Sequence, residues 1–111
     1  MRDDAAVSAD PGLFVAVGVF VVANEMDDAV QDAFRSRPHL VDGADGFVRM
    51  EVLRGVDDPK EFWLITHWRD EASYVAWHRG HTYHDSHAGI PKGLKLVRGS
   101  ASVRRMRSVA L

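Results

Sequence analysis

The chain of 111 residues is 46% hydrophobic and 27% charged, proportions that are typical of one globular domain rather than a disordered or collagen-like chain. Its formal net charge of −2 argues against a dedicated nucleic-acid-binding protein, so we expect no nucleic-acid partner. The absence of cysteine excludes disulfides, thiolate catalysis, iron–sulfur clusters and zinc ribbons, and favours a cytoplasmic location. The longest apolar run, residues 13–23, is too short to span a bilayer, so we expect no membrane partner.

Residues 1–12 are small and polar and predict a flexible leader before a single domain over residues 13–111. Residues 14–22 are β-branched and apolar on both faces, which is typical of a central strand covered on both sides. Asn24 is then expected to cap a helix, because apolar residues recur with helical spacing from Met26 until Pro38 ends the pattern.

Two segments of alternating apolar residues predict neighbouring strands over residues 47–53 and 61–68, joined by a turn at 55–60. In the first strand, one face carries Val48, Met50 and Val52 and the other carries Arg49 and Glu51. In the second, one face carries Phe62, Leu64, Thr66 and Trp68 and the other carries Trp63, Ile65 and His67.

Asp70 is expected to cap a second helix that Gly80 weakens, and residues 82–88 are expected to add one or two helical turns. A last, arginine-rich strand is predicted over residues 101–109. The order β-α-β-β-α-β is that of an α+β, ferredoxin-like fold with both helices on one face of an antiparallel sheet. The apolar first strand leaves the other face in need of a cover, which predicts a homodimer, a dimeric α+β barrel built from two sheets.

Histidine and tryptophan are the unusual residues, since five of the six histidines fall between His67 and His87. Three interpretations remain open from the residues alone. The histidines can be structural groups on a solvated helix face, or His84 and His87 can share a metal ion. Alternatively, one histidine ligates a haem iron while aromatic rings line an apolar slot. The chain has no Gly-x-Ser-x-Gly elbow and no phosphate-binding or dinucleotide-binding glycine motif.

The stretch ITHWRDEASYVAW, from Ile65 to Trp77, resembles the antibiotic biosynthesis monooxygenase superfamily. His87 follows Trp77 by ten residues in a Ser-His-Ala-Gly context, which resembles the IsdG-type haem-degrading monooxygenases in particular. The resemblance covers about residues 13–109. It implies that His87 is the metal ligand on the proximal side of haem. It also implies that Trp77 lies against the distal face and helps to ruffle the porphyrin, so that the two are the catalytic residues.

The resemblance implies a haem-degrading monooxygenase that opens the porphyrin ring with dioxygen and releases the iron. Haem is then both substrate and cofactor, and an external electron donor, a reductase of unknown identity, is required because the chain has no flavin or nicotinamide motif. We expect basic side chains after the second helix to reach the propionates. Those are Lys92, Lys95 and Arg98. The residues expected to line the apolar slot, or to support it, are Phe20, Val22, Phe62 and Trp68.

Gly18 stands where the family places an asparagine in the first strand, a side chain that can hydrogen-bond the ligand on the distal side of the iron. Two alternatives to a haem-degrading enzyme are open, and Gly18 favours the second. One is a cofactor-independent monooxygenase of a small aromatic substrate, since the superfamily contains such enzymes. The other is a non-catalytic haem carrier, which needs the axial histidine but no distal hydrogen-bond donor.

Overall fold

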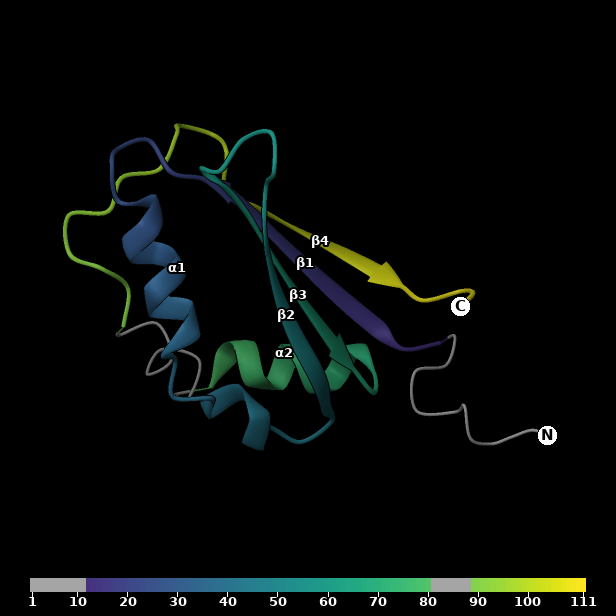
Figure 1. Cartoon of the computed structure of the whole chain (residues 1–111). Helices are drawn as coiled ribbons and strands as arrows, with labels where there is room; N and C mark the ends of the chain where they lie inside the picture. The colour runs from purple at the N-terminus through teal and green to yellow at the C-terminus, as the bar shows by residue number, and fades with distance from the viewer. Residues whose placement is uncertain (1–11, 81–88) are drawn as a thin grey trace.

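The computed structural model describes residues 12–80 and 89–111, which form a four-stranded antiparallel sheet with two helices. Figure 1 shows both helices on the same side of the sheet. The sheet order β2-β3-β1-β4 confirms the predicted ferredoxin-like arrangement. The elements in chain order are β1 (Phe14–Val21), α1 (Asp27–Arg35), the 3-10 helix η2 (Leu40–Gly43), β2 (Phe47–Arg54), β3 (Glu61–Trp68), α2 (Glu71–Arg79) and β4 (Ser102–Arg107).

The predicted cap at Asn24 is wrong, because α1 begins only at Asp27 and Met26 occupies the capping position without a side-chain hydrogen bond. The Asn24 side chain is instead used across the chain, where its Nδ2 donates to the carbonyl oxygen of Gly93 at 2.9 Å. Two aspartates in the first turn of α1 supply the negative charge that favours a helix N-terminus. By contrast, the predicted cap at Asp70 is confirmed, since its carboxylate accepts from the Ser73 backbone N–H at 2.9 Å.

The register of β1 against β3 decides which side chains face the helices. Phe14 pairs with Trp68, Gly18 with Leu64 and Phe20 with Phe62, so these residues share the helix-facing side. The buried centre of the core lies between this side and α1, where three side chains are at most 2% exposed. They are Val22, Val30 and Phe62, with Phe20, Phe34, Val52 and Leu94 packed around them.

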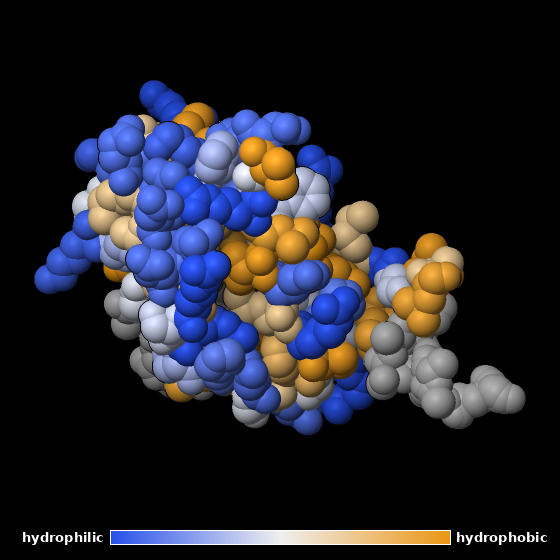
Figure 2. All heavy atoms as spheres, viewed as in Figure 1, coloured by the Kyte–Doolittle hydropathy of each residue, from blue (hydrophilic) through white to orange (hydrophobic). Residues whose placement is uncertain are grey.

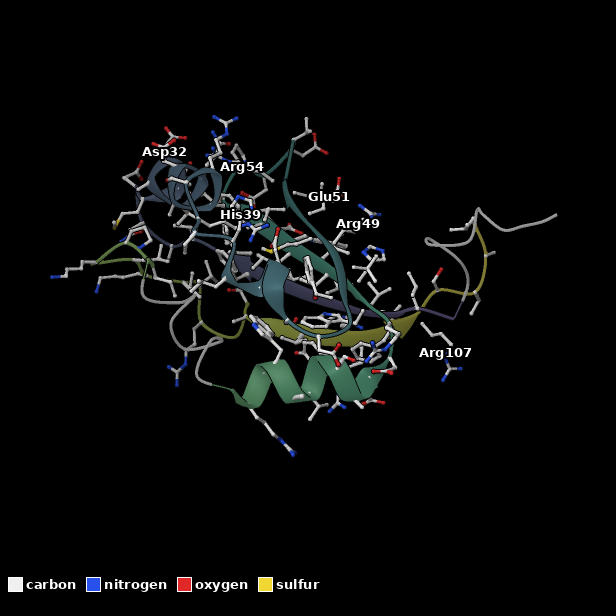
Figure 3. The ribbon with its side chains drawn as sticks, turned by 90° about the horizontal axis from the view of Figure 1, so that it is seen from below. Asp32, His39, Arg49, Glu51, Arg54 and Arg107 are labelled. Carbon is white, nitrogen blue, oxygen red and sulfur yellow. The ribbon has the colours of Figure 1, made fainter. Side chains whose placement is uncertain are left out.

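An ionic cluster joins the β2–β3 hairpin to the first turn of α1. The Arg54 guanidinium lies 5.4 Å from the centre of the Phe62 ring and donates to the carboxylates of Asp27 and Asp28. Lys60 donates to Asp27 at 3.1 Å, and this hydrogen bond holds the pKa of Asp27 below its usual value. Figure 3 shows Arg54 beside α1, whereas Arg49 and Glu51 project from β2 on the side away from α2.

The other side of the sheet, which we call the open face, carries apolar side chains that neither helix covers. Trp63 and Leu53 are 41% and 42% exposed at one end of it. In Figure 2, apolar side chains gather over the strands, while hydrophilic residues cover α1. By register, the apolar residues of the open face are Leu53, Trp63, Ile65, Met106 and the four valines of β1, Val15, Val17, Val19 and Val21.

His67 lies on the open face, in register between Val15 and Arg49, and makes the stability of the fold depend on pH. Burial, and next the charge of Arg49, hold the pKa of His67 below its usual 6.5, whereas Glu51 acts in the opposite direction. The unfolded chain therefore binds more protons than the native chain just below pH 6.5. We expect the free energy of unfolding to fall as the pH drops from 6.5 toward the lower native pKa, and to be independent of this group at higher pH.

Urea unfolding between pH 5 and pH 8 measures this effect. His67→Gln is expected to remove part of the acid destabilisation, whereas His39→Gln, at an exposed position beside Asp42, serves as the matched control. An equal acid slope in the wild type and His67→Gln would contradict the assignment.

Candidate functional site

On the helix-facing side of β1, the two middle positions, Ala16 and Gly18, carry little or no side chain. The positions at the two ends of this face, Phe14 and Phe20, carry large aromatic rings. On one side of these small residues lies an aromatic cluster with ring centroids 5.5–6.5 Å apart. Its members are Phe20, Phe34 and Phe62. On the other side lies a second cluster with ring centroids 5.3–5.8 Å apart. Its members are Phe14, Phe47, Trp68, Tyr74 and Trp77.

We call the small-residue stretch of β1 and the β3 residues paired with it the floor. A Cβ atom added at Gly18 would lie 3.8 Å from the Cβ and carbonyl oxygen of Leu64, and, apart from Gly18 and its chain neighbours, no atom of residues 12–80 and 89–111 would lie closer. That distance is an ordinary van der Waals contact. Among the described residues, the floor therefore accepts a Cβ atom at Gly18 without a clash.

Trp77 projects from α2, and its ring centroid lies 5.6 Å from that of the buried Trp68. It also lines a hollow of about 270 Å³ between α2 and the loop before β2. The other residues around this hollow are Ala44, Asp45, Ser73, Ala76 and Gly80. Trp77 thus joins the second aromatic cluster to this hollow.

A polar network fixes the first turn of α2, and with it the direction of Trp77. The Arg69 guanidinium donates to Asp45 and to the Ser73 hydroxyl, both at 3.1 Å. Ser73 in turn donates to Asp70 at 2.7 Å, which lowers the pKa of that carboxyl. Gly46 completes the contact, because a Cβ there would collide with Ser73 and its φ of 81° is left-handed.

The residues predicted for the apolar slot are all brought to the helix-facing side. Val22, Phe62 and Trp68 are at most 1% exposed, so they belong to the packed core around the floor. The predicted ligand His87, its neighbours His81 and His84, and the expected helical turns over 82–88 lie outside the described residues. The basic residues predicted to reach a ligand from the following loop are exposed. They are Lys92, Lys95 and Arg98.

Among residues 12–80 and 89–111, no cluster of three or more His, Asp, Glu or Cys side chains could hold a metal ion. The alternative site at His84 and His87 lies in the remaining part of the chain. Within the same described ranges, no helix has the length and apolar character needed to cross a bilayer.

Sequence reasoning assigned no role to Thr66. Its hydroxyl oxygen accepts a hydrogen bond from Trp68 Nε1 at 2.9 Å. The alternation of β3 places the two on one face, two residues apart, and that spacing is the signal from which the contact could have been predicted.

A family model described as antibiotic biosynthesis monooxygenase matches residues 13–89 of the chain. A curated relative from Mycobacterium tuberculosis, haem oxygenase (mycobilin-producing), is 30% identical over 51 residues. That alignment covers 46% of this chain and 49% of the relative, so it spans about half the length of the curated protein.

Solved structures share the fold over most of the chain. The haem-degrading protein MhuD from Mycobacterium tuberculosis, solved with two haems in its active site, has a TM-score of 0.70 and 24% identity. The match covers 86% of this chain and 95% of MhuD. A Bordetella bronchiseptica protein assigned to the antibiotic biosynthesis monooxygenases has a TM-score of 0.74 at 12% identity, covering 88% of this chain and 98% of that protein.

Proposed function

The chain belongs to the antibiotic biosynthesis monooxygenase family, and from this membership we propose that it binds haem and opens the porphyrin ring with dioxygen, releasing the iron. The observation that carries the proposal is the floor at Ala16 and Gly18 between two aromatic clusters. The alignment with the mycobacterial haem oxygenase supports the choice of haem among the substrates of the family.

The described residues fit a flat, apolar group with an anionic edge. The small residues Ala16 and Gly18 present no bulky side chain to such a group, and Trp77 would supply an aromatic wall. Cations in the loop that follows residues 81–88 suit carboxylate groups at the mouth of a pocket. Two of them are Lys95 and Arg98, both exposed.

When bound, haem would supply the iron that reduces dioxygen and the ring carbon that is oxidised. The protein's part is to hold and shape it. His87, as a neutral imidazole, would ligate the iron through one ring nitrogen while the other donates to a carbonyl oxygen or a water. Trp77, on a helix fixed by the Arg69–Ser73 network, would contact the porphyrin and help to hold it in place.

The proposal includes a homodimer formed through the open face, an external reductase as the electron donor, and a cytoplasmic location. Val17, Val19 and Val21, which are only partly buried on the open face, support the homodimer, because a sheet gains from burying an apolar face against a second copy.

Titration of the apo-protein with haemin tests the binding step. We expect a saturable Soret band, distinct from that of free haemin, because a single imidazole ligand and an apolar pocket change the absorption of the iron porphyrin. Failure of the protein to change the haemin spectrum at micromolar concentrations would contradict haem binding. That result would favour a cofactor-independent monooxygenase.

Gly18→Asn is expected to accelerate haem degradation, because an amide on the floor can donate a hydrogen bond where Gly18 offers no side chain. One preorganised donor changes a rate by up to about 100-fold, and the contact distance at Gly18 leaves space for the first atom of the new side chain. The measurement is the decay of Soret absorbance under a reductant, with catalase present to remove free peroxide. Gly18→Ala is the matched control and should leave the rate near that of the wild type.

The same assay separates enzyme from carrier. A complex that keeps its Soret band in both the wild type and Gly18→Asn would favour a non-catalytic haem carrier.

A further inference from the structure

One side chain on the floor differs chemically from all its neighbours. The register of β1 and β3 places eight residues on the helix-facing side, and Thr66 alone among them carries a hydroxyl or an amide. The eight are Phe14, Ala16, Gly18, Phe20, Phe62, Leu64, Thr66 and Trp68. Trp68 adds an indole N–H, and that group is already engaged by Thr66.

The hydrogen bond with Trp68 determines which atom of the Thr66 hydroxyl is available to a ligand. An indole N–H is only a donor, so the oxygen of Thr66 must be the acceptor in the 2.9 Å hydrogen bond. The hydrogen of the hydroxyl is therefore left for another acceptor. Within residues 12–80 and 89–111, no protein acceptor takes it.

Thr66 also lies close to Gly18 on the floor, where a bound ligand could reach its hydroxyl. It pairs with Ala16, while Gly18 pairs with Leu64, so Thr66 is the diagonal neighbour of Gly18 on the same face. From Gly18 it lies toward Trp68, whose ring contacts Trp77. A ligand on the floor would meet the Thr66 hydroxyl between the glycine and the tryptophan wall.

We propose that Thr66 donates a hydrogen bond to the small oxygen or anion ligand held between haem and the sheet, with Trp68 orienting the hydroxyl for that purpose. The inference rests on the proposed haem function and deepens it by naming a ligand-contacting residue. A half-buried hydroxyl suits this role, because Trp68 occupies one of the two lone pairs of its oxygen and the hydroxyl hydrogen stays available to donate.

Fluoride binding to the ferric haem complex provides a test that does not depend on turnover, since fluoride is a strong hydrogen-bond acceptor. A hydrogen bond to a charged group contributes enough that its loss weakens binding by roughly 10-fold or more. We expect Thr66→Val to raise the fluoride dissociation constant by that factor at fixed pH. Thr66→Ser, which keeps the hydroxyl, should stay within about 3-fold of the wild type.

Valine leaves the buried Trp68 N–H without its acceptor, which lowers stability, so Thr66→Cys provides a second variant. Sulfur is a weak donor and a weak acceptor, and the cysteine variant should bind fluoride with intermediate affinity. Haemin affinity, measured from the Soret band, should be similar in all four proteins, because the proposed contact is to the small ligand and not to the porphyrin.

The outcomes separate this inference from the proposed function. Haem binding by every protein with equal fluoride affinity in the wild type, Thr66→Cys and Thr66→Val would overturn the role of Thr66 alone. The absence of a Soret change in the wild type itself would overturn the proposed function and the role of Thr66 with it.

Discussion

Replacement of His87 with alanine is expected to abolish the haem complex, with the affinity for haemin falling by more than about 100-fold. The apolar floor and the aromatic wall would contact the porphyrin without specificity for iron, so the imidazole of His87 would supply the one strong directed bond. The measurement is a haemin titration followed at the Soret band.

The matched controls are His81→Ala and His84→Ala, which remove neighbouring imidazoles of the same segment. Both should keep the wild-type Soret position and affinity. The assignment of His87 would be wrong if that variant bound haemin normally while either control lost binding. Loss in both His84→Ala and His87→Ala, with a stoichiometric requirement for a divalent ion, would instead favour the two-histidine metal site.

If the chain forms the proposed homodimer through its open face, Val17→Lys is expected to break that dimer into monomers or unfolded chains. Val17 lies in the middle of the open face, paired with Ile65 on one side and Arg104 on the other. A dimer that covers this face should bury more than about 2,000 Å², and an unpaired ammonium at its centre would carry a desolvation cost of several kcal/mol. Sedimentation velocity at micromolar concentration measures the oligomeric state.

Val56→Lys is the matched control, because it makes the same substitution at a valine that is 94% exposed in the β2–β3 turn. It should leave the sedimentation coefficient unchanged. A wild-type chain that sediments as a stable, folded monomer would contradict the dimer, whatever the variants do.

The strands were the most predictable part of the fold. Alternation in residues 61–68 placed Phe62, Leu64, Thr66 and Trp68 on one face, and the register confirms that all four face the helices. The reason is physical, since the side-chain period of a strand is two and a half-covered sheet leaves a clear apolar pattern. Strand ends were less predictable. The last strand was expected over 101–109 but runs over Ser102–Arg107, because pairing with β1 sets its length.

Helix starts depend on contacts that the local sequence does not contain. Asp70 was predicted correctly because its partner, Ser73, lies three residues away on the same helix. Asn24 was equally suitable by residue type, yet its amide is used by Gly93, 69 residues later in the chain. Asn24 therefore bonds a distant carbonyl oxygen and does not cap the helix, and residue preference alone does not predict that long-range hydrogen bond.

The site was predictable in its aromatic residues and not in its polar ones. Trp77 was singled out by its sequence context, and the structure places it against Trp68 beside an accessible hollow. The role of Arg69 in holding α2 depends on Asp45, 24 residues earlier, a pairing that the folded chain alone brings about.

The central claim is that this chain opens the haem ring with dioxygen, and single-turnover oxidation of the purified haem complex tests it most directly. The complex is mixed with a reductant in air, with catalase present, and the products are identified by mass spectrometry. The account predicts loss of the Soret band together with an oxygenated, linear tetrapyrrole and free iron. Recovery of intact haem after repeated reduction in air would contradict it.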